Sequence, residues 1–196
     1  MAAQALGYYH TRNYLHFSGT EDDPTLLIKV DLGSPVRLNE ISIDIQGEGK
    51  GTDAFALTLP ENLALGKRLN HGDYESIKTQ ISNRALRYGY FSGQYLQHQL
   101  RVNPANQADI DIQYLTGQRY KLGEVTYSQT LFSEDLLDRF IPFEPGVPYD
   151  AELIGQFNQD LLSSGYFNGV QVLAPADKAV GDVIPVEVTL SERDPH

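Results

Sequence analysis

"RALRYGYFSG", residues 84 to 93, ends an apolar helical pattern with Gly89 and then places two aromatic rings side by side. Glycine adopts most easily the left-handed conformation that closes a helix, and an apolar residue just after it folds back to seal the helix end. The same triplet occurs three times in the chain, as Gly7-Tyr8-Tyr9, Gly89-Tyr90-Phe91 and Gly165-Tyr166-Phe167. The sequence therefore indicates a structural repeat.

A helical pattern precedes two of these triplets. Apolar residues spaced by three and four positions form one stripe in each copy. Aspartates stand where each helix should begin, and their carboxylates would accept the free amide hydrogens of the first turn. We therefore predict two helices that begin after Asp73 and Asp150, with the apolar stripes Tyr74, Ile77, Ile81 and Ala85 in one copy and Leu153, Ile154, Phe157 and Leu161 in the other.

Three strands complete each copy. A turn glycine leads into a strand in residues 33–43 and again, 84 positions later, in residues 117–127. Alternating apolar residues after each triplet predict a second and a third strand with one covered face. They are Leu96, His98, Leu100 and Val102, then Ile110, Ile112 and Tyr114, in one copy, and Val170 and Val172, then Val186, Val188 and Leu190, in the other.

Short helices and one proline complete the predicted order of the elements. A short helix is expected at Ser133 to Phe140 and a less distinct one at Thr52 to Leu59. Pro185 lacks a backbone donor, so the paired part of the last strand is expected to begin at Val186. The order strand, helix, helix, strand, strand predicts an α+β unit in which two helices cover one face of a three-stranded sheet.

The repeat predicts three segments. Residues 36–117 and 118–196 each hold a complete unit, whereas residues 1–35 hold only the end of a helix and the last two strands, "NYLHF" and "TLLIKVDLG". A hairpin with one helical turn has too little apolar area to be stable alone. We expect residues 1–35 to be mobile or held against the second unit or another molecule, as the C-terminal remnant of a first domain.

The net charge of the chain indicates which classes of binding partner to expect. The formal net charge is −11, and residues 118–196, with 5 basic and 13 acidic groups, carry most of the excess. This balance disfavours nucleic acid, whose binding depends on clustered lysine and arginine, and favours basic protein segments. No apolar run approaches a bilayer span and no signal-peptide pattern opens the chain, which is typical of a soluble protein or a soluble piece of a longer one.

Motifs for catalysis or metal binding do not emerge. The five histidines lack metal-ligand spacing and the chain has no cysteine. "GEGKG", residues 47–51, departs from the phosphate-loop pattern and is interpreted as a flexible loop. Asp109 and Asp111 alternate with isoleucines, which puts both on the solvent face of a strand, and the acidic run 21–23 is interpreted as a solvated turn. We expect no catalytic residue, no cofactor and no metal.

The repeated unit resembles the polypeptide-transport-associated (POTRA) domain. The stretches "LNHGDYESIKTQISNRALRYGYFSG" and "FIPFEPGVPYDAELIGQFNQDLLSSGYFNGVQV" carry the resemblance, together with "IDIQYLTGQRYKLGEVTY". They are more similar to the TamA type of the outer-membrane assembly superfamily than to the BamA type. The resemblance implies three tandem POTRA domains on the periplasmic side of the outer membrane, ahead of a β-barrel that these residues do not include.

That resemblance also implies a function. Such proteins insert β-barrel outer-membrane proteins, among them autotransporters, and work with an inner-membrane-anchored partner of the TamB type. Client polypeptides would pair as an added strand with the exposed second strand of each unit, because an open sheet edge has unpaired backbone groups. The implied binding residues are Tyr95, Leu96, Gln97, His98, Gln99, Leu100 and Arg101 in one unit, and Gly169, Val170, Gln171 and Val172 in the other.

Three alternatives remain open at this point. The chain resembles, less closely, BamA and the two-partner-secretion transporters, which a count of complete units in the natural gene would distinguish. The units are alternatively passive spacers that hold a barrel at a distance. An enzyme built on a repeated α+β unit would need convergent polar groups in a pocket.

Overall fold

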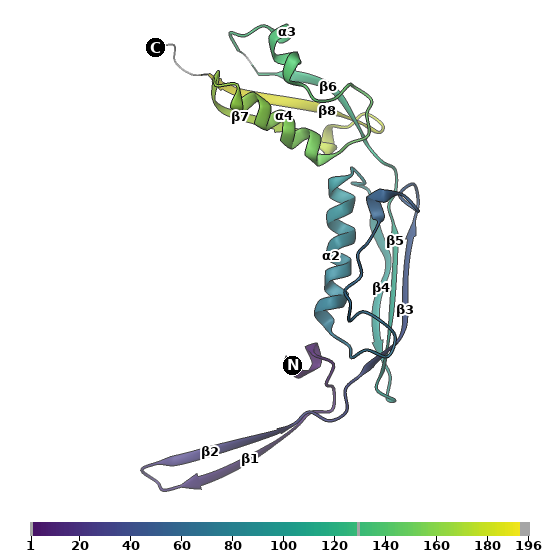
Figure 1. Ribbon diagram of the computed structural model, residues 1–196, viewed down its shortest axis with the longest axis vertical. Coiled ribbons are helices and arrows are strands. Elements are labelled where there is room, and N and C mark those ends of the chain that lie inside the picture. The colour runs from purple at the N-terminus through teal and green to yellow at the C-terminus, as the bar shows by residue number, and fades with distance from the viewer. Residues whose placement is uncertain (1, 129, 193–196) are drawn as a thin grey trace. The chain divides into compact units, whose positions relative to one another are not determined.

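The computed structural model describes residues 2–128 and 130–192, and its strands form three separate sheets (Figure 1). The first is an antiparallel hairpin of β1 (Arg12–Gly19) and β2 (Pro24–Asp31). The second has the order β3-β5-β4, and the third has the order β6-β8-β7. Their strands are β3 (Arg37–Gln46), β4 (Gln94–Val102), β5 (Gln107–Leu115), β6 (Lys121–Tyr127), β7 (Phe167–Leu173) and β8 (Val183–Glu192).

Helices alternate with these strands in the predicted order. The long helices are α2 (His71–Arg87) and α4 (Ala151–Ser163), and the α+β class is confirmed. The short helix expected at Ser133 to Phe140 is present as α3 (Glu134–Leu137) and η2 (Asp138–Phe140). The one expected at Thr52 to Leu59 is limited to a single 3-10 turn, η1 (Asp53–Phe55). The remaining short helices are α1 (Ala2–Ala5) and η3 (Ala176–Lys178).

Contacts within the chain divide it into two compact units, which are not the same as the repeated units predicted from the sequence. The first comprises Met1–Asp44, Leu57–Gln80 and Tyr95–Gln113, and the second comprises Ile45–Ala56, Ile81–Gln94 and Tyr114–His196. The division passes through the segment 36–117, so the three predicted domain ranges stay predictions. Each sheet nevertheless draws its strands from one of those ranges. Among the described residues, no helix is both long and apolar enough to cross a membrane.

The apolar stripe of α2 is buried as the spacing predicted, whereas Leu153 and Ile154 of the α4 stripe are only partly buried. All four residues of the α2 stripe are buried, and Phe157 and Leu161 of α4 have no exposed area. The α4 stripe packs in a cluster with the inward residues of the third sheet, among them Leu122, Val186 and Val188. Burial of side chains of this size stabilises each by roughly 1.5–3 kcal/mol, which is why the 3.6-residue pattern fixes the face that each helix presents.

The start of α2 differs from the prediction. The helix begins at His71, and the Oδ1 atom of Asn70 accepts a hydrogen bond of 2.9 Å from the Gly72 N–H. Asn70 is therefore the capping residue, whereas Asp73 lies inside the first turn. For α4 the prediction is confirmed, because Asp150 accepts a hydrogen bond of 2.9 Å from the Glu152 N–H.

The start of β8 also differs from the prediction. The strand is paired from Val183, two residues before the proline. The register with β6 shifts between the pairs Leu122–Ile184 and Val125–Val186, so Pro185 lies at a bulge. Pairing with β7 begins only at Glu187. No ladder bond is required from the position of Pro185, and the missing donor is tolerated there.

The first triplet contacts the start of β3. We call this contact, made by Gly7, Val36 and Leu69, junction A. The Gly7 carbonyl accepts a hydrogen bond of 2.8 Å from the Val36 N–H, and the Val36 carbonyl accepts one of 2.9 Å from the Leu69 N–H. Gly7 has a φ of +85°, and a Cβ atom there would lie 2.5 Å from the Leu69 carbonyl oxygen. The Tyr9 hydroxyl is hydrogen-bonded to Nε2 of His71 at 2.6 Å, and burial raises the pKa of Tyr9.

The second triplet makes the same contacts with the start of β6, which we call junction B, made by Gly89, Tyr120 and Tyr149. The Gly89 carbonyl accepts a hydrogen bond of 2.9 Å from the Tyr120 N–H, and the Tyr120 carbonyl accepts one of 2.9 Å from the Tyr149 N–H. Gly89 has a φ of +79°, and a Cβ atom there would lie 2.6 Å from Cβ of Tyr149. Burial raises the pKa of Tyr149, and the Asp150 carboxylate raises it further.

The two rings of the second triplet have different roles. Tyr90 is buried and packs edge-on against Phe55, with ring centroids 5.1 Å apart, as expected for a residue that fills the corner between helix and sheet. Phe91 instead packs edge-on against Tyr120 and Tyr149, at centroid distances of 5.6 and 4.9 Å. The triplet is thus a core element and a junction element at once, and the second role was not predicted.

Candidate functional site

The strand order places β4 and β7 at sheet edges, where the sequence predicted a polypeptide-binding surface. The opposite edges, β3 and β6, are covered at their starts by the loop that precedes each long helix. Leu38 exchanges backbone hydrogen bonds with Lys67 and Gly66, and Leu122 does so with Val147 and Gly146, at 2.7 to 2.9 Å. An incoming strand would therefore have better access to β4 and β7 than to the starts of β3 and β6.

The β4 edge carries an exposed apolar side chain and a row of hydrogen-bonded polar side chains. Leu96 is 50% exposed and His98 is exposed. Nε2 of Gln97 donates a hydrogen bond of 2.6 Å to Asp111 on the central strand, which fixes the polar face of β4. The Tyr95 hydroxyl donates to the Lys78 carbonyl of α2 at 2.8 Å and so orients its ring toward the helix.

The predicted alternation is interrupted in β4, because Leu96 and His98, which were expected on the covered face, are exposed together with Gln99. Gln99 accepts long hydrogen bonds from Gln97, at 3.5 Å, and from Arg101, at 3.4 Å. Leu100 is half-buried, whereas Gln99 and Arg101 are exposed. The structure therefore brings together, on one nine-residue edge strand, the seven residues predicted from Tyr95 to Arg101, although Leu100 faces the core side.

The β7 edge is less open than the sequence suggested. Val172 is buried and Val170 is half-buried, whereas Gln171 is exposed. Oδ1 of Asn158 on α4 accepts a hydrogen bond of 3.1 Å from the Val172 N–H. Because β7 has β8 on its other side, this side chain already satisfies a donor that an added strand would use. Of the four predicted residues, Gln171 is exposed, and Gly169 is half-buried like Val170.

Sequence reasoning did not identify Asn158. A signal was present, because Asn158 stands four residues after Ile154 on the flank of the apolar stripe. An amide side chain at such a position can bond to a strand that borders the helix. The sequence does not say which strand borders the helix at that point, so the partner could not be named before the fold was known.

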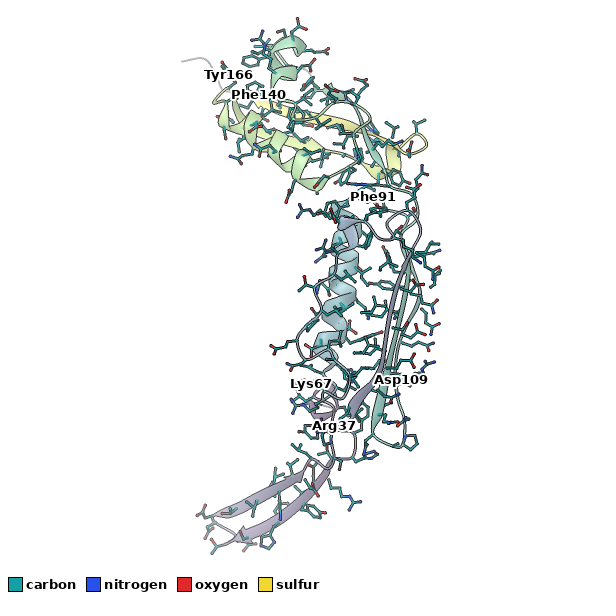
Figure 2. All side chains as sticks on the ribbon, turned by 45° about the vertical axis from the view of Figure 1, so that its right-hand side comes forward. Arg37, Lys67, Phe91, Asp109, Phe140 and Tyr166 are labelled. Carbon is teal, nitrogen blue, oxygen red and sulfur yellow. The ribbon has the colours of Figure 1, made fainter. Side chains whose placement is uncertain are left out.

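Other polar groups weighed from the sequence have structural roles. Asp109 accepts a hydrogen bond of 2.8 Å from Nδ2 of Asn39, on the face of the sheet opposite to α2 (Figure 2). The loop 47–51 is anchored by Gly49, whose N–H donates a hydrogen bond of 3.0 Å to the Thr116 hydroxyl. A Cβ atom on Gly49 would lie 2.5 Å from the Phe55 ring, so the glycine serves close packing. Within residues 2–128 and 130–192, no group of three or more His, Asp or Glu side chains is placed to hold a metal ion.

Part of the chain matches a known family. Residues 120–193 match the model of the family POTRA, described as a surface antigen variable number repeat. The match covers the segment that forms the third sheet. The predicted resemblance to POTRA domains is confirmed for these residues.

Solved structures extend the likeness in fold to most of the chain. The chain is similar to Haemophilus influenzae BamA POTRA3-5, with a TM-score of 0.54 and 18% identity over 97% of this chain and 77% of that one. It is also similar to BamA from Haemophilus ducreyi lacking POTRA domains 1-3, with a TM-score of 0.59 and 16% identity over 81% of this chain and 30% of that one. At these identities the comparison concerns the fold, and the finer resemblance to the TamA type stays a prediction.

Proposed function

We propose that this chain is the non-enzymatic periplasmic POTRA region of an outer-membrane assembly factor of the TamA type, and that it binds client polypeptides by strand addition. The observation that supports the proposal best is the β4 edge. This strand has a neighbour on one side, β5, and presents Leu96 and His98 at its exposed surface. Backbone pairing is indifferent to most side chains, which suits a protein with many unfolded clients.

Strand addition at β4 is tested by cross-linking in cells. A photoreactive amino acid at Leu96 or His98 is expected to capture precursors of outer-membrane proteins. Gln113 is the matched control, because it lies on the central strand β5 of the same sheet and is half-exposed. Equal capture from position 113, or none from positions 96 and 98, would contradict the proposal.

A second prediction concerns Asn158 and the β7 edge. Asn158→Ala frees the Val172 N–H, so a cross-linker at Gln171 is expected to capture more client than in the unsubstituted protein. The free energy of unfolding should fall by about 0.5–1.5 kcal/mol, because a part-buried donor loses one hydrogen bond. The yield is measured relative to that from Leu96. An unchanged yield at Gln171 would show that Asn158 does not restrict this edge.

A passive spacer is the competing interpretation. Leu96→Lys introduces a charge on an edge strand, and such charges oppose pairing with another chain. The side chain is half exposed, so the fold should tolerate the substitution. Under strand addition, outer-membrane insertion of clients should decrease in cells that carry Leu96→Lys. Unchanged insertion would favour the spacer.

The proposed partners are unfolded outer-membrane protein clients, an inner-membrane-anchored subunit of the TamB type, and a β-barrel in the same polypeptide. The acidic excess of residues 118–196 supports a basic contact face on one of them. Binding through that face should weaken as salt is added, because screening acts strongly on exposed charges. Titration of the purified partner at two ionic strengths measures this dependence.

A further inference from the structure

Junctions A and B share a geometry that depends on backbone atoms and on one glycine each. In both, the helix-exit glycine has a positive φ and its carbonyl accepts an N–H from the start of the next unit's first strand. In both, the residue just before the helix N-cap packs against that glycine. Leu69 does so in junction A and Tyr149 in junction B. The contacting atoms differ, since they belong to the Leu69 backbone in junction A and to the Tyr149 side chain in junction B, so the shared element is the hydrogen-bonded backbone arrangement.

The third triplet offers the same surface without a partner among the described residues. Gly165 has a φ of +79°, equal to that of Gly89, but a Cβ atom there would meet nothing within 4 Å. Within residues 2–128 and 130–192, no turn or loop amide donates to the Gly165 carbonyl. Tyr166 is 45% exposed, although its ring centroid lies 5.2 Å from that of Phe132.

The rings of the third triplet have exchanged roles relative to the second. β7 begins at Phe167, two residues after the glycine, whereas β4 begins at Gln94, five residues after Gly89. The shorter connection turns Phe167 into the core, where it is 2% exposed, and leaves the Tyr166 ring outside. Tyr166 is thus the ring available to a partner, as Phe91 is in junction B.

Spacing indicates what the partner is. The donor to the carbonyl of the helix-exit glycine follows that glycine by 29 residues in junction A and by 31 in junction B. The same intervals from Gly165 reach positions 194 to 196, just past β8 and outside the described residues. A second copy of this chain is a poor occupant, because its two equivalent donors, Val36 and Tyr120, already bond to Gly7 and Gly89.

We propose that Gly165 and Tyr166 form a third junction, which binds the stretch of extended backbone that comes after β8 in the longer polypeptide. That stretch would donate an N–H to the Gly165 carbonyl and place an apolar or aromatic side chain against Gly165 and Tyr166. The inference rests on the proposed function, since it takes the chain as one part of a longer outer-membrane protein. It adds the residues through which the last unit is joined to the next part of that protein.

The proposal is tested in the full-length protein with a photoreactive amino acid in place of Tyr166. The expected product is an intramolecular adduct, which mass spectrometry would map to a peptide beyond residue 192. Val180 is the matched control, because it is 83% exposed in the same compact unit but lies in the turn between β7 and β8, at the other end of those strands. A cross-linker at Val180 should give no such adduct.

Three other outcomes would each contradict the proposed third junction. These outcomes are an adduct with a second copy, an adduct with a different protein, and the absence of any adduct. The melting temperature of the purified substituted protein tests whether its fold is intact, because the Tyr166 ring is 45% exposed but also packs against Phe132. Cross-linking from Leu96 in the same cells reports on strand addition separately, so failure of the junction and failure of the proposed function can be distinguished.

Discussion

Gly89→Ala is expected to lower the free energy of unfolding by about 3 kcal/mol, because two costs combine at one position. Alanine is strained by about 1–2 kcal/mol at a positive φ, which is +79° here. Its Cβ atom would also lie 2.6 Å from Cβ of Tyr149, and atoms so close to the backbone move only if the backbone moves. Overpacking of this kind typically costs about 1–3 kcal/mol.

Gly165→Ala provides the control for this prediction. The two glycines have the same φ, but nothing lies within 4 Å of a Cβ atom at Gly165. We therefore expect a loss of about 1–2 kcal/mol in this chain, due to backbone strain alone. Urea denaturation of the two variants measures the difference. Equal losses would show that junction B does not resist the added methyl group.

Phe157→Ala is expected to lower the free energy of unfolding of the third sheet and its helices by about 3–5 kcal/mol. The side chain has no exposed area and lies in a cluster with Leu122, Leu161 and Val186. Its removal leaves a cavity that the surrounding strands can fill only in part. Leu162→Ala on the same helix is the control, because Leu162 is 41% exposed and its truncation should cost less than about 1 kcal/mol.

Hydrogen exchange locates the effect of Phe157→Ala and tests the predicted domain ranges. Amides of β7 and β8 should exchange faster in the variant, whereas those of Ile110 and Ile112 in β5 should keep their protection. This result would support a separate core in residues 118–196. Faster exchange throughout β5 would indicate that residues 36–196 unfold as one cooperative unit.

Patterns with a short period predicted most of the fold. The apolar stripe of α2 and the alternation in β5 each assign one buried face, and both faces are buried in the structure. The start of α2 is harder to predict from the sequence, because Asn70 and Asp73 are both good capping residues and lie three positions apart. The structure selects Asn70, and a carboxylate oxygen of Asp73 is buried without a hydrogen-bond partner among the described residues.

Contacts between distant segments were harder to predict than the elements themselves. The bulge opposite Pro185 depends on the register of β6 against β8, which the alternation alone does not fix. The bond from the Val172 N–H to Asn158 depends on which strand borders α4. The edge position of β4 and β7, by contrast, was expected from the POTRA resemblance, and the strand order of both sheets agrees with it.

The backbone character of junctions A and B bears on how such proteins change during evolution. A connection made by a carbonyl, an amide and a glycine imposes little on the neighbouring side chains, and Leu69 and Tyr149 fill the same place. A gene duplication that adds a unit, or a deletion that removes one, would therefore bring a compatible joint with it. Variation in the number of units within a lineage would then require few compensating substitutions.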